Sequence, residues 1–199
     1  ETTTLALNLR RKDTEIFVIG SFDSESKFLS LETQKLKSVL EQTGRGYFVI
    51  GLLDVGQEPT NHALRDIVKE KESFEKWGRP ILLLFKDETQ MKNFKAEEFG
   101  KLPETVHFGI DVDGAIRKQI ATNMKLGDDP QMPIFFTADT FNRVVFLSKG
   151  YTIGLGAQLM NVVQKLKKDD SLRLDRTFAK NHPKTRTEKR LKKQKKGLL

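Results

Sequence analysis

The chain has 199 residues, of which 37% are hydrophobic and 31% are charged, and its formal net charge is +8. These proportions are typical of a soluble globular protein with one very polar segment, and no apolar run approaches the roughly 20 residues of a membrane helix. The absence of cysteine excludes thiol redox chemistry, cysteine nucleophiles and thiolate zinc sites.

The positive charge is confined to the C-terminal end of the chain. Residues 165–199 hold 14 Lys and Arg against 4 Asp and Glu, which leaves 21 against 23, a net of −2, in residues 1–164. We therefore predict a flexible basic tail over residues 167–199, because so polar a segment cannot bury enough surface to offset its ordering entropy. Its densest cations could contact phosphates of nucleic acid or another anionic surface, although the tail has only one aromatic residue for base stacking. These cations are Lys189, Arg190, Lys192, Lys193, Lys195 and Lys196.

The first 40 residues give weak signals. Because residue 1 is Glu, we expect the chain to be a processed or excised part of a longer protein. Residues Thr2–Leu9 alternate loosely and suggest an edge strand or a linker. The apolar run Ile16–Ile19 predicts a short buried strand. The pattern that opens at Ser30 and places Leu36, Val39 and Leu40 on one face predicts a helix.

The middle of the chain alternates strands with helices. Apolar runs predict strands at Tyr47–Leu53, Ile81–Phe85 and Val106–Ile110, the second of them near the middle of the sheet. Between and after them we expect helices from about Asn61 to Trp77, with Thr60 as N-cap, from Glu88 to Phe99, and over the residues that include Ile116, Ile120 and Met124. This alternation is typical of a mostly parallel α/β sheet.

The most informative stretch is Met132–Gly156. Two apolar runs, Ile134–Phe136 and Val144–Leu147, flank a turn rich in Asp and Asn, which predicts an antiparallel hairpin. Pro133 opens its first strand, and glycines lead into a helix from about Leu155 to Leu166. Those glycines match neither a dinucleotide fingerprint nor a P-loop, so no cofactor is expected.

This order of proline, strand, turn, strand, glycine and helix resembles the second half of a thioredoxin fold. The resemblance implies a cis bond before Pro133 and, after a core strand, a cysteine pair that faces the proline. Placing that pair after Ile81–Phe85 assigns its positions to Gln90 and Asn93, neither of which can form a disulfide. With Met132 and Pro133, these residues are predicted to form a vacated redox site that could accept a peptide.

Two phrases narrow the resemblance further. Gly56–Asp66 (GQEPTNHALRD) and Phe141–Gly156 (FNRVVFLSKGYTIGLG) are similar to the C-terminal region of large bacterial cell-envelope proteins with a transglutaminase-like domain upstream. The resemblance implies that the catalytic cysteine lies outside this chain, that the chain is an accessory domain, and that it is periplasmic or associated with the cell envelope.

A metal site could be built from Glu58, His62 and Asp66. Their spacing of four residues places all three on one helical face if the helix includes Glu58, and two carboxylates with an imidazole could bind a divalent metal. The alternative, which we favour, is a helix that starts after Glu58. His62 and Asp66 are then ordinary first-turn residues near the positive end of the helix dipole.

The run Val106–Gly114 resembles the nucleophile motif of haloacid dehalogenase-type phosphatases, an apolar strand followed by Asp-x-Asp-Gly. The resemblance implies that Asp111 attacks phosphorus, Asp113 acts as general acid and magnesium neutralises charge, with Asp128 and Asp129 as a later acidic pair. The motif should open a domain, however, and fewer than 90 residues follow Asp111. A loop before a helix, with Asp113 near the N-cap, is the favoured alternative.

Together these features predict an α/β, thioredoxin-like central mixed sheet flanked by helices. We expect a domain over residues 1–166, with its core at about 79–166 and an N-terminal βα extension at 1–78, followed by the basic tail. The predicted function is a non-catalytic accessory domain that binds a protein, a peptide or other domains of the same polypeptide. The alternatives are a nucleic-acid or anionic-surface binder that uses the tail, and a metal-dependent hydrolase that uses Asp111 and Asp113.

Overall fold

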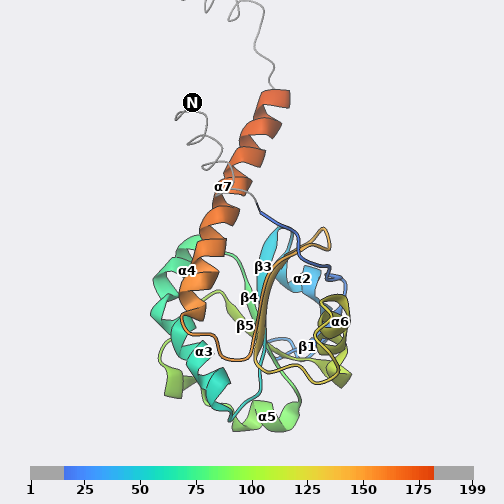
Figure 1. The fold of residues 1–199 in the computed structure, drawn as a ribbon, viewed down its shortest axis with the longest axis vertical. Helices are drawn as coiled ribbons and strands as arrows, with labels where there is room; N and C mark the ends of the chain where they lie inside the picture. The colour runs from blue at the N-terminus through green and yellow to red at the C-terminus, as the bar shows by residue number, and fades with distance from the viewer. Residues whose placement is uncertain (1–15, 182–199) are drawn as a thin grey trace, which may run out of the picture. The chain divides into compact units, whose positions relative to one another are not determined.

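The computed structural model describes residues 16–181 (Figure 1). The chain separates into two compact units. Residues 15–164 form the unit that contains the sheet and the helices packed on it. The last helix, α7 (Leu155–Asn181), begins in this unit and continues into the second one.

In the described residues, seven strands form one sheet in the order β2-β1-β5-β4-β3-β6-β7. Its centre is the parallel set β3 (Tyr47–Leu52), β4 (Ile81–Phe85) and β5 (Val106–Ile110). Every residue of β3 and β4 is buried, which explains their continuous apolar sequences, because both faces of the sheet are covered there. The three predicted strands and the mixed α/β class are confirmed.

A hairpin of β6 (Ile134–Asp139) and β7 (Val144–Lys149) completes one side of the sheet, as predicted. Asp139 organises its turn: Oδ1 accepts the backbone N–H of Phe141 at 3.0 Å and of Arg143 at 3.1 Å. Its Oδ2 accepts Nε of Arg143 at 2.7 Å. The carboxylate is only 2% exposed, so this turn is held by a buried charged group.

The segment after Ser30 is not the predicted helix. It forms β1 (Lys27–Ser30), β2 (Leu36–Ser38) and the short α2 (Val39–Thr43). β1 pairs with β2 and also with β5, a partner about 80 residues away, and this tertiary pairing overrides the local helical pattern. α2 begins at Ser38 with a capping box, in which Ser38 and Glu41 exchange side-chain to backbone hydrogen bonds at 2.6 and 3.1 Å.

The predicted buried strand Ile16–Ile19 is also wrong. Phe17, Val18 and Ile19 are 66%, 54% and 50% exposed. An isolated bridge between the next residue, Gly20, and Val144 joins the chain to the sheet here, and the N–H of Ile19 donates to the carbonyl of Val144 at 2.8 Å. The other early candidate, residues Thr2–Leu9, lies outside the described residues.

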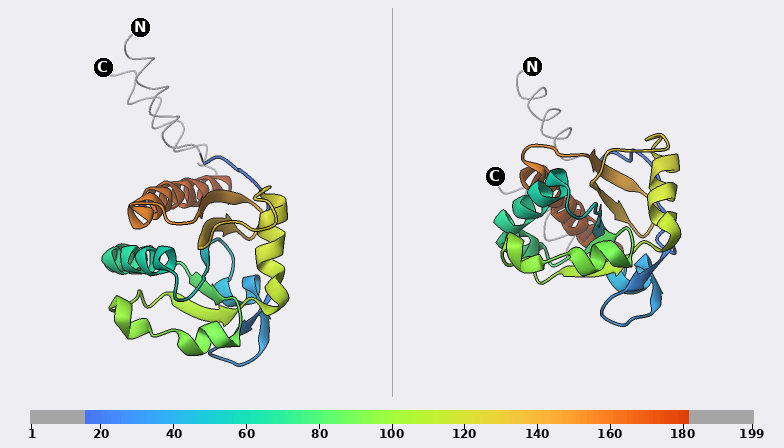
Figure 2. Two further views of the ribbon diagram at one scale, coloured as in Figure 1. Left: turned by 60° about the horizontal axis from the view of Figure 1, so that its bottom comes forward. Right: turned by 90° about the horizontal axis from the view of Figure 1, so that it is seen from below.

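Helices cover both faces of the sheet. The remaining helices are α3 (Glu58–Lys69), α4 (Lys71–Trp77), α5 (Glu88–Asn93) and α6 (Ala115–Asn123). Figures 1 and 2 show α3, α4 and the start of α7 on one face and α2 and α6 on the other. The predicted helix over Glu88–Phe99 consists of α5 followed by a separate 3₁₀ turn, Ala96–Phe99.

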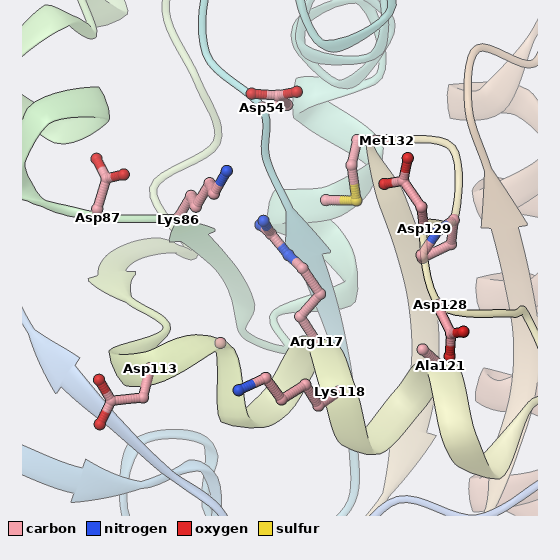
Figure 3. A pocket seen from close by; sticks show the side chains of 12 residues that line it. Asp54, Lys86, Asp87, Asp113, Arg117, Lys118, Ala121, Asp128, Asp129 and Met132 are labelled. Carbon is pink, nitrogen blue, oxygen red and sulfur yellow. The ribbon is translucent and has the colours of Figure 1, made fainter.

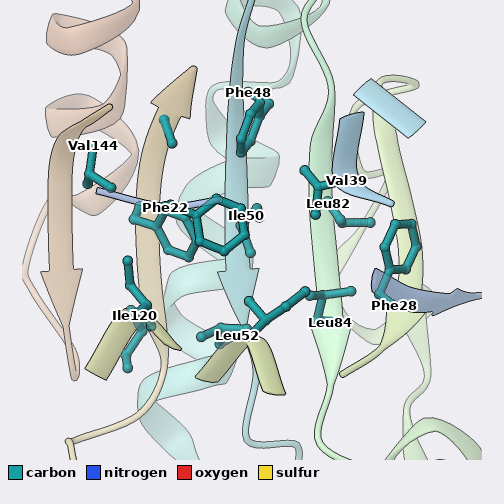
Figure 4. Packing of buried hydrophobic residues seen from close by; sticks show 14 residues of the cluster. Phe22, Phe28, Val39, Phe48, Ile50, Leu52, Leu82, Leu84, Ile120 and Val144 are labelled. Carbon is teal, nitrogen blue, oxygen red and sulfur yellow. The ribbon is translucent and has the colours of Figure 1, made fainter. Parts of the chain in front are cut away.

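The core under α6 follows the two-residue period of the strands. Phe48, Ile50 and Leu52 of β3 point to this face, with alternate residues of β4 beside them (Figure 4). Ile116 and Ile120, one helical turn apart on α6, close over them and are fully buried. The apolar positions predicted for this helix are therefore confirmed as its core face.

The expected domain plan needs two corrections. A core limited to residues 79–166 omits β3, which lies inside the sheet between β4 and β6. The expected tail from residue 167 begins as helix, because α7 runs on to Asn181. Lys189, Arg190, Lys192, Lys193, Lys195 and Lys196 lie outside the described residues.

Candidate functional site

The candidate site lies where β3 and β4 end and β6 begins. The bond between Met132 and Pro133 is cis, as the thioredoxin resemblance implies. β6 runs antiparallel to β3 with Ile134 opposite Leu52, which places Pro133 beside the loop that starts at Leu53. That loop leads into α3, so the proline faces the turn between β3 and α3.

This register corrects the predicted position of the vacated redox site. Gln90 and Asn93 follow β4, but β6 pairs with β3 and not with β4. The turn that faces the proline is instead Asp54–Gln57, and the sequence prediction missed it. The predicted turn still reaches the site through Gln90, whose Nε2 donates to Oδ1 of Asp54 at 2.7 Å. Asn93 is exposed on α5 and lines neither cavity described below.

A cavity of about 570 Å³ is lined in part by Met132. Strand ends β3 and β4, the loop before β6 and the start of α6 form its wall (Figure 3). Charged side chains dominate this wall, with five carboxylates and three cations. They are Asp54, Asp87, Asp113, Asp128, Asp129, Lys86, Arg117 and Lys118.

Arg117 extends from α6 into this cavity toward Asp54 (Figure 3). One guanidinium nitrogen, Nη2, donates to the carbonyl of Leu53 at 3.2 Å. Its Nε is buried and has no hydrogen-bond acceptor among the residues that the structure describes. Burial lowers the pKa of Arg117, and the nearby carboxylates of Asp111, Asp54 and Asp87 oppose that shift.

A second cavity, of about 440 Å³, is also lined by Met132. It shares Asp54, Asp129, Pro130 and Met132 with the first, so the two cavities adjoin. The remainder of its wall comes from the start of α3, the loop before β6 and the loop after β7. These residues are Gln57, Pro59, Gln131, Gly150 and Tyr151.

Glu58, His62 and Asp66, the candidate metal ligands, are only partly brought together. α3 does include Glu58, with Gln57 as its N-cap, so Thr60 is not the N-cap that the sequence suggests. Nε2 of His62 lies 3.4 Å from Glu58, and its ring packs on Tyr151 with centroids 4.7 Å apart. Asp66 lies instead 3.7 Å from the ammonium of Lys69. Among residues 16–181, no cluster of three His, Cys, Asp or Glu side chains is arranged to hold a metal ion.

Asp111 does not have the geometry of a phosphatase nucleophile. Its side chain is fully buried, and its two oxygens accept the backbone N–H groups of Ile116 at 2.8 Å and Arg117 at 3.0 Å. The carboxylate therefore caps α6 and is not presented to a substrate. Asp113 is exposed, has a positive φ of 56° and reaches the rim of the first cavity.

Replacing Asp111 with alanine is expected to lower the free energy of unfolding by about 2 kcal/mol, because two buried amides of α6 lose a charged acceptor. Urea denaturation of the two proteins measures this difference. The matched control is Asp113→Asn, which keeps a side chain that tolerates positive φ and should change stability by less than about 0.5 kcal/mol. Equal stability of Asp111→Ala and the parent would contradict the capping role.

The parent and the Asp111→Ala variant also test the ionisation of Asp111. Burial raises the pKa of its carboxyl above 3.8, against the opposing effect of the two amide hydrogen bonds. A raised folded-state pKa means that the folded protein binds the proton more tightly than the unfolded chain. The contribution of this protonated carboxyl to the free energy of unfolding is fully present below pH 3.8. It is lost as the pH rises through the pKa of Asp111 in the folded protein. We expect the stability difference between the parent and Asp111→Ala to be larger at acidic than at neutral pH.

The comparisons with known proteins concern the fold. Neither models of protein families nor curated proteins give a match to this chain. Solved structures do match: peroxiredoxin Q from Xanthomonas campestris has 16% identity and a TM-score of 0.53, with 71% of this chain and 90% of that chain covered. A thioredoxin-like protein from Porphyromonas gingivalis has 18% identity and a TM-score of 0.52, with 74% and 92% covered.

A third match is a SCO1/SenC family lipoprotein from Bacillus anthracis, with 14% identity, a TM-score of 0.54, and coverage of 74% of this chain and 96% of that one. In the part of the chain that the structure describes, no helix is long and apolar enough to cross a membrane. The cis-proline, its facing turn and these structural neighbours agree on the architecture. The chain has a thioredoxin-like fold and contains no cysteine.

Proposed function

We propose that this chain is a non-catalytic protein-binding domain, and that it binds an extended peptide segment in the groove formed by the two cavities beside Pro133. The observation that carries the proposal is the combination of a retained cis-proline and a facing turn, Asp54–Gln57, in a chain without cysteine. A redox site cannot work without thiols, whereas a groove for an extended segment needs only shape and hydrogen-bonding groups.

The backbone next to the proline supports this role. Among the described residues, neither the N–H nor the carbonyl of Met132 takes part in a backbone hydrogen bond. The groups on either side are satisfied, since the N–H of Gly150 donates to the carbonyls of Gln131 and Pro133 at 3.1 and 2.9 Å. A peptide strand laid along the groove could use the free groups of Met132 as strands do in a sheet.

The sequence similarity of Gly56–Asp66 and Phe141–Gly156 to bacterial cell-envelope proteins supports a proposal about the larger protein that contains this chain. The first phrase contains the start of α3 and the second contains β7 and the turn before α7, so both border the groove. We propose that the chain is an accessory domain of a transglutaminase-like cell-envelope protein, whose other domains are candidate sources of the bound segment. A SCO1/SenC family lipoprotein among the structural neighbours agrees with an envelope location.

A peptide-display selection tests the binding function. Random dodecapeptides displayed on phage are selected against the purified chain, and the affinity of synthetic versions is measured by fluorescence anisotropy. We expect Met132→Lys to weaken the selected peptides by at least about tenfold, because a long cation would occupy the floor shared by both cavities.

The matched control is Met91→Lys, the same substitution at a half-buried methionine of α5 that lines neither cavity. It should leave the affinities unchanged. Failure to enrich any peptide, or equal effects of the two substitutions, would refute the proposed groove.

A further inference from the structure

Carboxylates outnumber cations by two in both cavities of the groove, but only the first cavity contains cations. All three cations of the site, Lys86, Arg117 and Lys118, line the first cavity. The second cavity contains no cation and two carboxylates, Asp54 and Asp129. An extended ligand that crosses Met132 therefore passes from a region with cations to a region with only negative charge.

Arg117 is the cation best placed to receive a ligand. Its neighbours on the surface, Lys86 and Lys118, are exposed, whereas Arg117 is partly buried and its Nε has no acceptor. A buried donor without an acceptor is costly, and a carboxylate can accept from two nitrogens of one guanidinium at once. No protein carboxylate lies within ion-pair distance of Arg117 among the described residues, although Asp54, Asp87 and Asp111 lie near enough to influence it.

The second cavity has the composition that suits a cation. Tyr151 contributes an aromatic ring that is 43% exposed as a residue and is supported by its packing against His62. Asp54 is held by its hydrogen bond to Gln90, and Asp129 is exposed across the same opening. Carboxylates and an aromatic ring are the groups that attract a lysine ammonium or an arginine guanidinium.

We propose that the groove selects a peptide segment carrying one acidic and one basic side chain, with the acidic side chain at Arg117 and the basic side chain between Asp54, Asp129 and Tyr151. This inference rests on the proposed peptide-binding function and specifies its ligand. The inference is more specific than the proposed groove, because it predicts that neutral peptides of equal size bind less well than peptides with both charges.

A double-mutant cycle tests the acidic contact. A selected peptide and its Glu→Gln version are measured against the parent chain and against Arg117→Gln, with thermal unfolding to confirm that each variant is folded. We expect Arg117→Gln to weaken the Glu peptide by at least about tenfold and to leave the Gln peptide nearly unchanged. Arg117→Lys should recover part of the loss, because lysine keeps the charge without the two-nitrogen geometry. Lys118→Gln is the exposed control and should have a smaller effect.

The basic contact is tested in the same format. Replacing the peptide's lysine with norleucine should weaken binding to the parent about tenfold and have little effect on a chain with Asp129→Asn and Tyr151→Leu. Selected peptides with no preference for either charge, but still sensitive to Met132→Lys, would overturn this inference and leave the proposed groove standing. If no peptide is selected at all, both proposals fail.

Discussion

Replacing Asp139 with alanine is expected to lower the free energy of unfolding by about 3 kcal/mol. The carboxylate is 2% exposed, accepts two backbone N–H groups in the β6–β7 turn and pairs with Arg143. Alanine would leave those amides without their acceptor and the half-buried guanidinium without its counter-charge. Urea denaturation of the parent and the variant measures the loss.

Asp128→Ala is the matched control, since Asp128 is an exposed carboxylate in the same unit. It should change stability by less than about 0.5 kcal/mol. A loss at Asp139 no larger than that at Asp128 would show that the turn is held by its backbone alone.

The second large effect is expected at Gly51, near the end of β3. A methyl group there would lie 2.5 Å from Cε1 of Phe135 and 2.8 Å from Cδ2 of Leu83, both in neighbouring strands and both buried. Such contacts are too short, so the side chains or the strands must move. We expect Gly51→Ala to lower the free energy of unfolding by about 3 kcal/mol, as measured by chemical denaturation.

A compensating substitution shows whether crowding is the cause. Phe135→Leu removes the ring that comes closest, so it should cost less in the Gly51→Ala background than in the parent. We expect a coupling of about 1 kcal/mol between the two sites. Strict additivity would mean that the loss at Gly51 arises elsewhere, for instance from the conformational preference of glycine itself.

The sequence predicts where the strands of this fold begin and end better than it predicts which strands pair with each other. The runs Tyr47–Leu53 and Ile81–Phe85 are recognisable because both faces of each strand are covered. Their order in the sheet depends on pairing between distant segments, which no local pattern encodes. The sequence alone therefore places the vacated redox site after β4, although β6 pairs with β3.

Local sequence patterns also predict the wrong secondary structure where pairing with a distant strand determines it. Leu36 and Leu40 share a helical face in the sequence, yet Leu36 lies in β2 and is 59% exposed. The capping box of Ser38 and Glu41 was the available signal that the helix begins only there. Its position, eight residues after Ser30, would have shortened the predicted helix to the observed α2.

For the proposed groove, the sequence predicts Met132, Pro133 and Gln90 but gives no indication of Asp54 or Arg117. Asp54 could have been found by testing each apolar strand as the partner of the proline strand. Arg117 has no such signal, because adjacent basic residues at the start of a helix look alike in sequence. Only the folded chain distinguishes Arg117, which points into the first cavity with Nε buried, from the exposed Lys118 beside it.

The position of β3 also affects how the chain can fold. One edge of β3 pairs with β4, about 30 residues later, but the other pairs with β6, where Tyr47 lies opposite Asp139, 92 positions along the chain. Pairings at such separation require closure of a long loop and slow the search for the native topology. During synthesis, β3 keeps one apolar edge open until β6 has been made. A strand that is interior in the finished sheet is thus exposed to misassociation for most of the time that the ribosome needs to produce this domain.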